Sequence, residues 1–264
     1  MHIMQSKKNW AIGSIIAIVF IGIIGYVVFR NPGKETPSVE TNKKGDNSIG
    51  VEGTGDFTVE EVPSQSAIPI PSLSRPINVI VSLSQESEAI VTARLKQIID
   101  SLKKNPNQLS LWLELGVYRK TIGDYEGARE AWEYAATRES KNYIAQLNLA
   151  NLYTQEIKNY PLAERHRLKV IELNPSEDAY EQLYQLYRYN YKEKEQFADD
   201  ILIKGLERFF DSISLRIDLA RYYKETGNST SARMYYKQAI AIAVKNKNTL
   251  VEQSIREELA ALSK

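Results

Sequence analysis

The sequence contains no cysteine, which excludes disulfide scaffolds, thiol catalysis and zinc sites built on thiolates. Histidine is nearly absent too, and His2 and His166 lie too far apart in the sequence to suggest a metal site. Neither sign of charge dominates, because 34 lysines and arginines against 33 acidic residues leave a formal net charge of +1. A dedicated nucleic-acid-binding protein usually carries a strong basic excess. We therefore expect no metal, no cofactor and no nucleic-acid partner.

Charge is also missing from residues 11–29, a run rich in isoleucine, valine and phenylalanine. As an α-helix this run would rise about 29 Å, close to the hydrocarbon thickness of a bilayer. Trp10 and Tyr26 lie near its two ends, where amphipathic rings prefer the membrane interface. No small-x-small cleavage site follows the run. The pattern predicts a short tail at 1–10 and an uncleaved, single-pass transmembrane helix at 11–29 that contacts the lipid bilayer.

The orientation of this helix rests on a weak charge difference. Lys7 and Lys8 precede it, and Arg30 and Lys34 follow it, so the positive-inside rule is nearly balanced. A short N-terminal tail with a lysine pair is the ordinary arrangement for a cytoplasmic N-terminus. We therefore expect the N-terminus in the cytoplasm and the bulk of the chain outside it.

Residues 30–84 hold six of the nine prolines and a glycine cluster at 45–55, without helical periodicity. Such a stretch has few large apolar residues to offset its ordering entropy, so we expect a flexible linker that stiffens near 68–71. The glycines at 51–55 match neither common phosphate-loop pattern. The apolar segment 77–81 is either a short strand or an extended segment that docks onto the following domain, and the sequence leaves both open.

From about residue 85 the pattern is almost entirely helical, and it repeats. Four alanines lie 35, 35 and 34 residues apart, namely Ala128, Ala163, Ala198 and Ala232. Four positions after them come Trp132, Arg167, Leu202 and Tyr236, and seven positions after them come Ala135, Val170, Gly205 and Ala239. Small residues let two antiparallel helices approach closely, as Gly116 facing Ala128 would permit, and large ones fill the space between hairpins. Gly123 and Gly227 supply the turn between helices, since glycine tolerates positive φ.

The residues Trp112-x-x-Leu115-Gly116 followed by Ala128-x-x-x-Trp132 are similar to the W-x-x-L-G…A-x-x-x-F pattern of the tetratricopeptide repeat family. The resemblance implies an all-α fold, a right-handed solenoid of stacked helical hairpins over 85–264. Its units are expected at about 109–142, 143–177, 178–212 and 213–246, with a capping helix at 249–263. The helix expected at about 86–104 is either the second helix of an incomplete leading unit or an N-terminal cap. The two middle units depart from the pattern, through Arg167 where an aromatic residue is usual and a longer turn at 192–195.

In tetratricopeptide arrays the first helix of each hairpin lines a concave groove that holds a partner polypeptide. By resemblance, the groove residues here are Leu113, Val117, Lys120, Leu147, Asn151, Thr154, Gln185, Arg188, Ile217, Arg221 and Lys224. This groove would be apolar at its N-terminal end and basic at its C-terminal end, and would suit a peptide that is acidic toward one end. Leu113 and Val117 replace the lysine and asparagine of chaperone-docking family members, so that activity is not expected. An alternative is that some of these residues pack against the cap or the segment 77–81.

Nothing in the sequence favours an enzyme. The adjacent acidic residues at 60–61, 199–200 and 257–258 would point in different directions on a helix, which makes them poor acid–base pairs. His166 lies in a basic stretch that is either an exposed outer face or a phosphate-binding patch. We expect a membrane-anchored adaptor or assembly scaffold that binds a protein or peptide. The alternatives are a self-associating structural protein that forms homo-oligomers and a non-catalytic regulatory subunit of a membrane enzyme complex.

Overall fold

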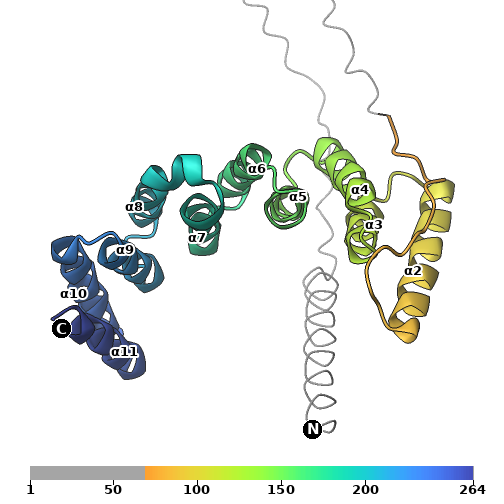
Figure 1. The fold of residues 1–264 in the computed structure, drawn as a ribbon. Coiled ribbons are helices and arrows are strands. Elements are labelled where there is room, and N and C mark those ends of the chain that lie inside the picture. Colours follow the sequence, from red (N-terminus) through yellow and green to blue (C-terminus); the bar gives the residue numbers. More distant parts are fainter. Residues whose placement is uncertain (1–68, 264) are drawn as a thin grey trace, which may run out of the picture. The chain divides into compact units, whose positions relative to one another are not determined.

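The computed structural model describes residues 69–263, which form helices and no strand (Figure 1). The helices are α2 (Gln85–Lys104), α3 (Leu109–Thr121), α4 (Tyr125–Arg138), α5 (Tyr143–Gln155), α6 (Tyr160–Leu173), α7 (Glu177–Gln185), α8 (Ala198–Arg208), α9 (Ile213–Glu225), α10 (Ser229–Lys245) and α11 (Thr249–Ala260). The all-α class expected from the sequence is confirmed for this part of the chain.

Each helix packs mainly against its neighbours in the sequence. The pairs α3–α4, α5–α6, α7–α8 and α9–α10 form antiparallel hairpins, and α4–α5, α6–α7 and α8–α9 join one hairpin to the next. In Figure 1 the elements accordingly follow one another in chain order from α2 to α11. This is the repeating arrangement that the alanine spacing predicts, and its four hairpins coincide with the four expected units.

Local sequence signals explain where the helices begin. A side-chain oxygen accepts a backbone hydrogen bond in the first turn of most of them, from the caps Ser84, Asp124, Asn142, Asn159, Ser176, Ser212, Asn228 and Asn248. Gly123 and Gly227 have φ values of 85° and 82° in the turns before α4 and α10. These values lie in the left-handed region, so both predicted turns are confirmed.

The repeating alanines lie at the centre of the hairpins, where all four are fully buried. The nearest neighbour of Gly116 is Trp132 of α4. A Cβ atom on Gly116 would lie 2.2 Å from Nε1 of Trp132, so the glycine makes room for the indole. Trp132 also donates a hydrogen bond from Nε1 to the carbonyl oxygen of Leu113 at 2.9 Å, which fixes the ring against α3.

Residues 69–84, which we call the N-terminal strap, do not behave as the predicted linker. Leu73, Ile77 and Val79 pack against the core formed by α2, α3 and α4. The backbone N–H of Ile80 donates to the carbonyl oxygen of Ile122 at 2.8 Å. The folded part therefore begins before residue 84, and the segment 77–81 is extended and docked rather than a strand. The remainder of the predicted linker lies outside the described residues.

A buried arginine explains why the strap is held. Arg119 on α3 is 2% exposed, and it donates to the carbonyl oxygens of Pro76 at 2.6 Å and Arg75 at 2.8 Å. The same guanidinium pairs with Asp124 at 3.1 Å, and Asp124 pairs with the side chain of Arg75 at 2.9 Å. A buried charge is tolerated only when it is paired and hydrogen-bonded, so Arg119 needs both the strap and Asp124. The proline content of the strap does not indicate that Arg119 and Asp124 hold it in place.

The third hairpin departs from a regular pair of helices. Helix α7 is short and continues directly as a π-helical turn, η1 (Leu186–Asn190), which is followed by a 3-10 segment, η2 (Lys192–Phe197). The longer turn predicted at 192–195 is thus present as η2. A π-helical turn widens the helix locally and changes the direction of the side chains that follow it.

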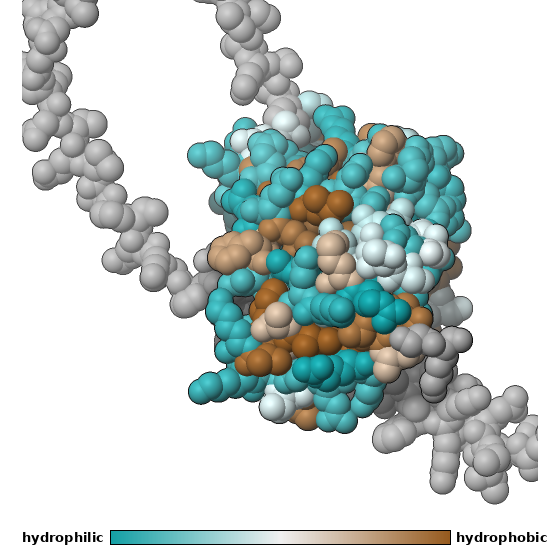
Figure 2. Space-filling model, turned by 90° about the vertical axis from the view of Figure 1, so that its left-hand side faces the viewer, coloured by the Kyte–Doolittle hydropathy of each residue, from teal (hydrophilic) through white to brown (hydrophobic). Residues whose placement is uncertain are grey.

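The array ends as the sequence predicts, with α11 and a short 3-10 turn, η3 (Ala261–Ser263). Ile255 is buried against α10, and Val251 and Leu259 pack beside it. Figure 2 is viewed from the side where α10 and α11 lie in Figure 1, and bands of apolar side chains alternate there with hydrophilic ones. Between residues 69 and 263 no helix has the length and apolar character needed to cross a bilayer. The tail at 1–10 and the helix predicted at 11–29 lie outside the described residues.

Candidate partner-binding site

The first helices of the hairpins, α3, α5, α7 with η1, and α9, carry all the predicted groove residues. We call the surface that they form the first-helix face, and the surface formed by α4, α6, α8 and α10 the second-helix face. The apolar members of the predicted groove are only partly exposed. Leu113, Val117 and Ile217 pack against the buried clusters, and Leu147 is half-buried. Much of the apolar end of the groove therefore serves packing. Leu113 and Ile217 belong to clusters that include strap or α11 residues, as the alternative interpretation held, whereas Val117 packs in the central cluster.

Cations on this face are paired within the chain, and the pairs share a spacing. Lys120 lies 3.3 Å from Glu156, Arg188 lies 3.1 Å from Glu225, and Arg221 lies 2.6 Å from Glu258. Each pair joins one first helix to the next one along, or to α11, about one repeat further in the sequence. We call this series the ion-pair ladder. It neutralises most of the positive charge that the sequence assigned to the C-terminal end of the groove, although Lys224 remains exposed.

Two further contacts hold Arg188 in place. It makes a very short ion pair with Glu195 of η2, and its guanidinium carbon lies 5.3 Å from the centre of the Tyr222 ring. Cation–π contacts of this kind add to the attraction of the carboxylates. Arg188 is therefore committed to joining η1, η2 and α9.

The ladder is interrupted between α5 and α7, where no ion pair joins these two helices within the described residues. A hollow of about 490 Å³ opens there, which we call the Arg167 pocket. It brings together the predicted groove residues Thr154 and Gln185. The other lining residues are Gln155, Lys158, Tyr160, Arg167, Gln182, Leu186 and Asn190.

Arg167 reaches this pocket from α6. It is 4% exposed, and its Nη2 donates to Oδ1 of Asn151, another predicted groove residue, at 2.6 Å. Its Nε and Nη1 are buried, and no hydrogen-bond acceptor in the described part of the chain faces them. Burial lowers the pKa of Arg167 to about 10, and the carboxylate of Asp178 opposes that shift. The guanidinium is therefore charged at neutral pH and only partly satisfied.

Sequence reasoning noted Arg167 as a departure from the repeat but did not predict its role. The sequence signal was an arginine at a position where the other units have Trp132, Leu202 and Tyr236. All three of these residues are buried. A cation in a position that the repeat buries needs a partner. The amide of Asn151 is the only one that the described residues give it through a hydrogen bond.

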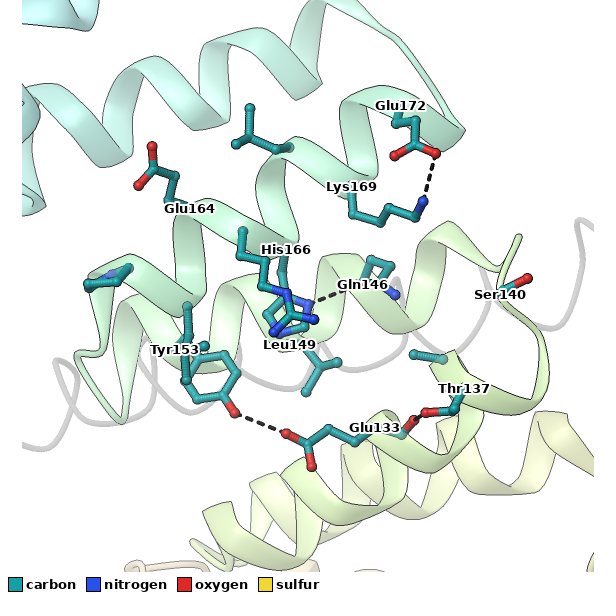
Figure 3. A pocket seen from close by; sticks show the side chains of 15 residues that line it. Glu133, Thr137, Ser140, Gln146, Leu149, Tyr153, Glu164, His166, Lys169 and Glu172 are labelled. Atoms are coloured by element: carbon teal, nitrogen blue, oxygen red, sulfur yellow. Dashed lines mark hydrogen bonds and ion pairs between the residues drawn. The ribbon is translucent and has the colours of Figure 1, made fainter. Parts of the chain in front are cut away.

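The second-helix face has its own hollow, of about 960 Å³, between α4, α5 and α6 (Figure 3). His166 lies inside it, stacked on Tyr153 with ring centres 5.5 Å apart, and its Nδ1 lies 2.7 Å from Oε1 of Gln146. Burial, helped by the positive charge of Arg165, lowers the pKa of His166 to about 4. His166 is therefore half-buried, and its lowered pKa leaves the imidazole neutral at neutral pH.

The other polar groups of this hollow are largely paired with each other. The hydroxyl of Tyr153 donates to Glu133 at 3.1 Å, and Lys169 lies 2.6 Å from Glu172, as the dashed lines in Figure 3 show. Among residues 69–263 no cluster of histidine and acidic side chains could hold a metal ion. The hollow thus offers no buried charged group comparable to Arg167, although the exposed Arg165 also lines it.

Four in-phase helical hairpins, capped by α2 and α11, define a tetratricopeptide-like helical repeat protein. The fold is similar to the crystal structure of MamA, with a TM-score of 0.49 and 19% identity over 64% of this chain and 99% of that chain. It is also similar to a tetratricopeptide repeat protein from Parabacteroides merdae, with a TM-score of 0.47 and 18% identity over 68% of this chain and 76% of that one.

A thermophilic TPR protein from Thermus thermophilus gives a TM-score of 0.40 and 18% identity, over 67% of this chain and 92% of that one. No protein-family model matches the sequence, and no curated protein matches it. The repeat class therefore rests on the hairpins and their spacing in this chain.

Proposed function

We propose that this chain is a non-catalytic, membrane-anchored adaptor or assembly scaffold that binds a partner polypeptide on its first-helix face. The observation that carries the proposal is the Arg167 pocket. It interrupts the ion-pair ladder and exposes polar side chains on the face where repeat arrays of this kind hold their partners.

The chemistry of the pocket suits a peptide backbone. Gln155, Gln182 and Gln185 line it, and each carries both a hydrogen-bond donor and an acceptor in its amide group. An extended polypeptide presents the same two kinds of group along its length. Gln185 is exposed, so its amide is free to turn toward a ligand. These features support binding of a polypeptide.

The membrane anchor is the second part of the proposal. It rests on the uncharged run at 11–29 with Trp10 at its edge, and the lysine pair before that run favours an N-terminus in the cytoplasm and a repeat array outside it. Because the chain has no cysteine, a thiol introduced at one position is the only group in it that a maleimide labels. Single-cysteine variants Ser6→Cys and Lys237→Cys are treated in intact cells with a membrane-impermeant maleimide.

Labelling of the cysteine at position 237 alone supports this orientation. Labelling at position 6 alone would show that the orientation is the reverse of the proposed one. Extraction of the protein from the membrane by carbonate at high pH would show that it has no transmembrane anchor. The parent chain, which has no thiol, gives the background in both arms.

The binding face is tested by photo-crosslinking of the full-length protein in its membrane. A benzophenone amino acid replaces Gln185 or Lys224 on the first-helix face, and Lys204 or Lys237 on the second-helix face as matched controls. All four side chains are exposed. We expect a discrete polypeptide to be captured from the first pair and not from the second. Equal capture from both faces contradicts the proposal, and capture of only a second copy of this chain replaces it with self-association.

A further inference from the structure

The Arg167 pocket is positive, and none of its lining residues is acidic. Its two charged lining residues, Arg167 and Lys158, are both cations, and the rest are amides, hydroxyl-bearing or apolar. The ladder cations Lys120, Arg188 and Arg221 each have a carboxylate partner within the chain. Arg167 has only an amide oxygen. The chain thus gives each cation of the ion-pair ladder a carboxylate and leaves Arg167 with an amide oxygen alone.

The position of Arg167 makes this arrangement costly for folding. A guanidinium carries five N–H donors, and those of Nε and Nη1 are buried without an acceptor in the described residues. An apolar residue fits the equivalent place in the next unit, where Leu202 is fully buried. A buried charge that an apolar side chain could replace is a reason to look for a ligand that completes its hydrogen bonds.

We propose that the Arg167 pocket binds a carboxylate that the partner polypeptide presents, either an aspartate or glutamate side chain or a C-terminal carboxylate. This inference rests on the proposed function. It names the chemistry by which that partner is recognised.

The geometry of the guanidinium fits this ligand. A carboxylate is planar, has two acceptor oxygens and pairs with the edge of a guanidinium through two parallel hydrogen bonds. The guanidinium has two edges that can bind a carboxylate. One is formed by Nε and Nη2, and the other by Nη1 and Nη2. A carboxylate that reaches either edge would therefore accept a hydrogen bond from a nitrogen that has no partner in the chain. Lys158 would add a second positive charge at the rim.

The chain's own nearby acid does not fill this role. Asp178, at the start of α7, is close enough to raise the pKa of Arg167, but it is exposed and accepts a hydrogen bond from Gln182 at 3.4 Å. Gln182 and Gln185 line the pocket beside Arg167. Exposed side chains such as Gln185 change rotamer in picoseconds to nanoseconds, so a ligand can enter without movement of a helix.

The π-helical turn η1 gives the pocket one wall. Leu186 and Asn190, at the two ends of η1, both line it, and Gln185 is the last residue of α7 before the turn. Turns of this kind occur frequently at functional sites because they change the direction of side chains within a continuous helix. Here the change of direction lies next to the unsatisfied guanidinium.

The test uses the full-length protein in detergent and three small probes. N-acetylglycine presents a terminal carboxylate, N-acetylglutamate N-methylamide presents a side-chain carboxylate, and N-acetylglutamine N-methylamide is the neutral match. The readout is the ¹⁵N resonance of the Arg167 Nε–H group, assigned by its loss in Arg167→Leu. The Nε–H group of Arg221, which donates to Glu258 at 2.9 Å, serves as a control in the same spectrum.

We expect a saturable shift of the Arg167 resonance with the carboxylate probes, no such shift with the neutral probe, and little change at Arg221. The carboxylate that binds more tightly identifies the source, a chain terminus or an acidic side chain. The same probe should raise the unfolding temperature of the parent protein and leave that of Arg167→Leu unchanged.

Three outcomes would overturn the inference: no saturable shift with either carboxylate, an equal shift with the neutral probe, or thermal stabilisation that persists in Arg167→Leu. The second of these would mean that the pocket holds water or amides only. None of them affects the photo-crosslinking test, so the adaptor function can stand without the carboxylate site. Conversely, carboxylate binding without crosslinking from Gln185 or Lys224 would support the carboxylate site and contradict the proposed adaptor function.

Discussion

The indole of Trp132 lies where a side chain on Gly116 would have to be. A Cβ atom at position 116 would come within 2.2 Å of Nε1, 2.4 Å of Cε2 and 2.6 Å of Cδ1 of the ring. The ring is also tied to α3 by its hydrogen bond to Leu113. The first hairpin closes around this pair, and α5 packs against α4.

Substituting Gly116 should therefore destabilise the protein although it lies within a helix. Gly→Ala in a helix normally stabilises by about 1 kcal/mol, but the overlap with the ring costs roughly 3 kcal/mol. We expect Gly116→Ala to lower the free energy of unfolding by about 2 kcal/mol in urea denaturation. Trp132→Phe in the same background should reduce this loss, because the smaller ring removes the overlap. Independent, additive effects of the two changes would show that the residues do not compete for space.

The two turn glycines form a matched pair that isolates the contribution of the strap. Gly123 and Gly227 have nearly the same positive φ, so substitution by alanine carries a similar backbone penalty of about 1 kcal/mol at each. A Cβ atom at 123 would also lie 3.0 Å from Val81 and 3.2 Å from Ile80, whereas nothing lies within 4 Å at 227. Gly123→Ala should cost about 1 kcal/mol more than Gly227→Ala. Equal losses of unfolding free energy would mean that the strap does not pack on this turn.

Replacing Arg167 with leucine should separate stability from binding. Leucine occupies the equivalent place at Leu202, and removal of a partly satisfied buried charge stabilises by about 1 kcal/mol. We expect Arg167→Leu to unfold at a higher urea concentration than the parent chain. Arg221→Leu is the control, since it removes an arginine that has a carboxylate partner and should lower stability by up to about 1 kcal/mol. A similar loss in both variants would show that Arg167 is fully satisfied in the folded protein.

His166 should make the protein sensitive to acid. Its pKa falls from 6.5 to about 4 on folding, so the folded state disfavours the protonated ring. The resulting stability is complete above pH 6.5 and is lost as the pH falls toward 4, with a total on the order of 3 kcal/mol. His166→Asn keeps a group that can bond to Gln146 but does not titrate. We expect the difference in unfolding free energy between parent and variant to shrink as the pH falls from 7 to 4. A difference that stays constant would contradict a lowered pKa of His166 in the folded protein.

The sequence was sufficient to predict the hairpins but not the surface contacts between them. The phase of Ala128, Ala163, Ala198 and Ala232 predicts the repeat because two helices can cross closely only where the side chains between them are small. The partner of Arg221 is Glu258, in another helix, and periodicity does not identify such a partner. The ion pairs of the ladder join residues about one repeat apart, so opposite charges at that spacing are a signal that the sequence carries. The residue pattern of a single helix does not contain this signal.

The strap could not have been predicted from its own residues. Its prolines and short polar residues are typical of a flexible chain, and its order depends on Arg119 and Ile122, which lie in another element. Similarly, Arg167 was visible as an exception to the repeat. The pocket around it depends on η1, and a π-helical turn has no clear signal in a single sequence.

The strap also determines how mechanical load would enter the repeat array. Any pull on the chain from upstream of residue 69 reaches Arg75 and Pro76 before it reaches α2, and these residues are held by Arg119 and Asp124. Tension is therefore transferred to the turn between α3 and α4, in the first complete hairpin. Helix α2 follows the strap in the chain, so the force reaches it only after the contacts of the strap with Arg119 and Asp124 have broken. These contacts therefore protect the packing of α2 on α3.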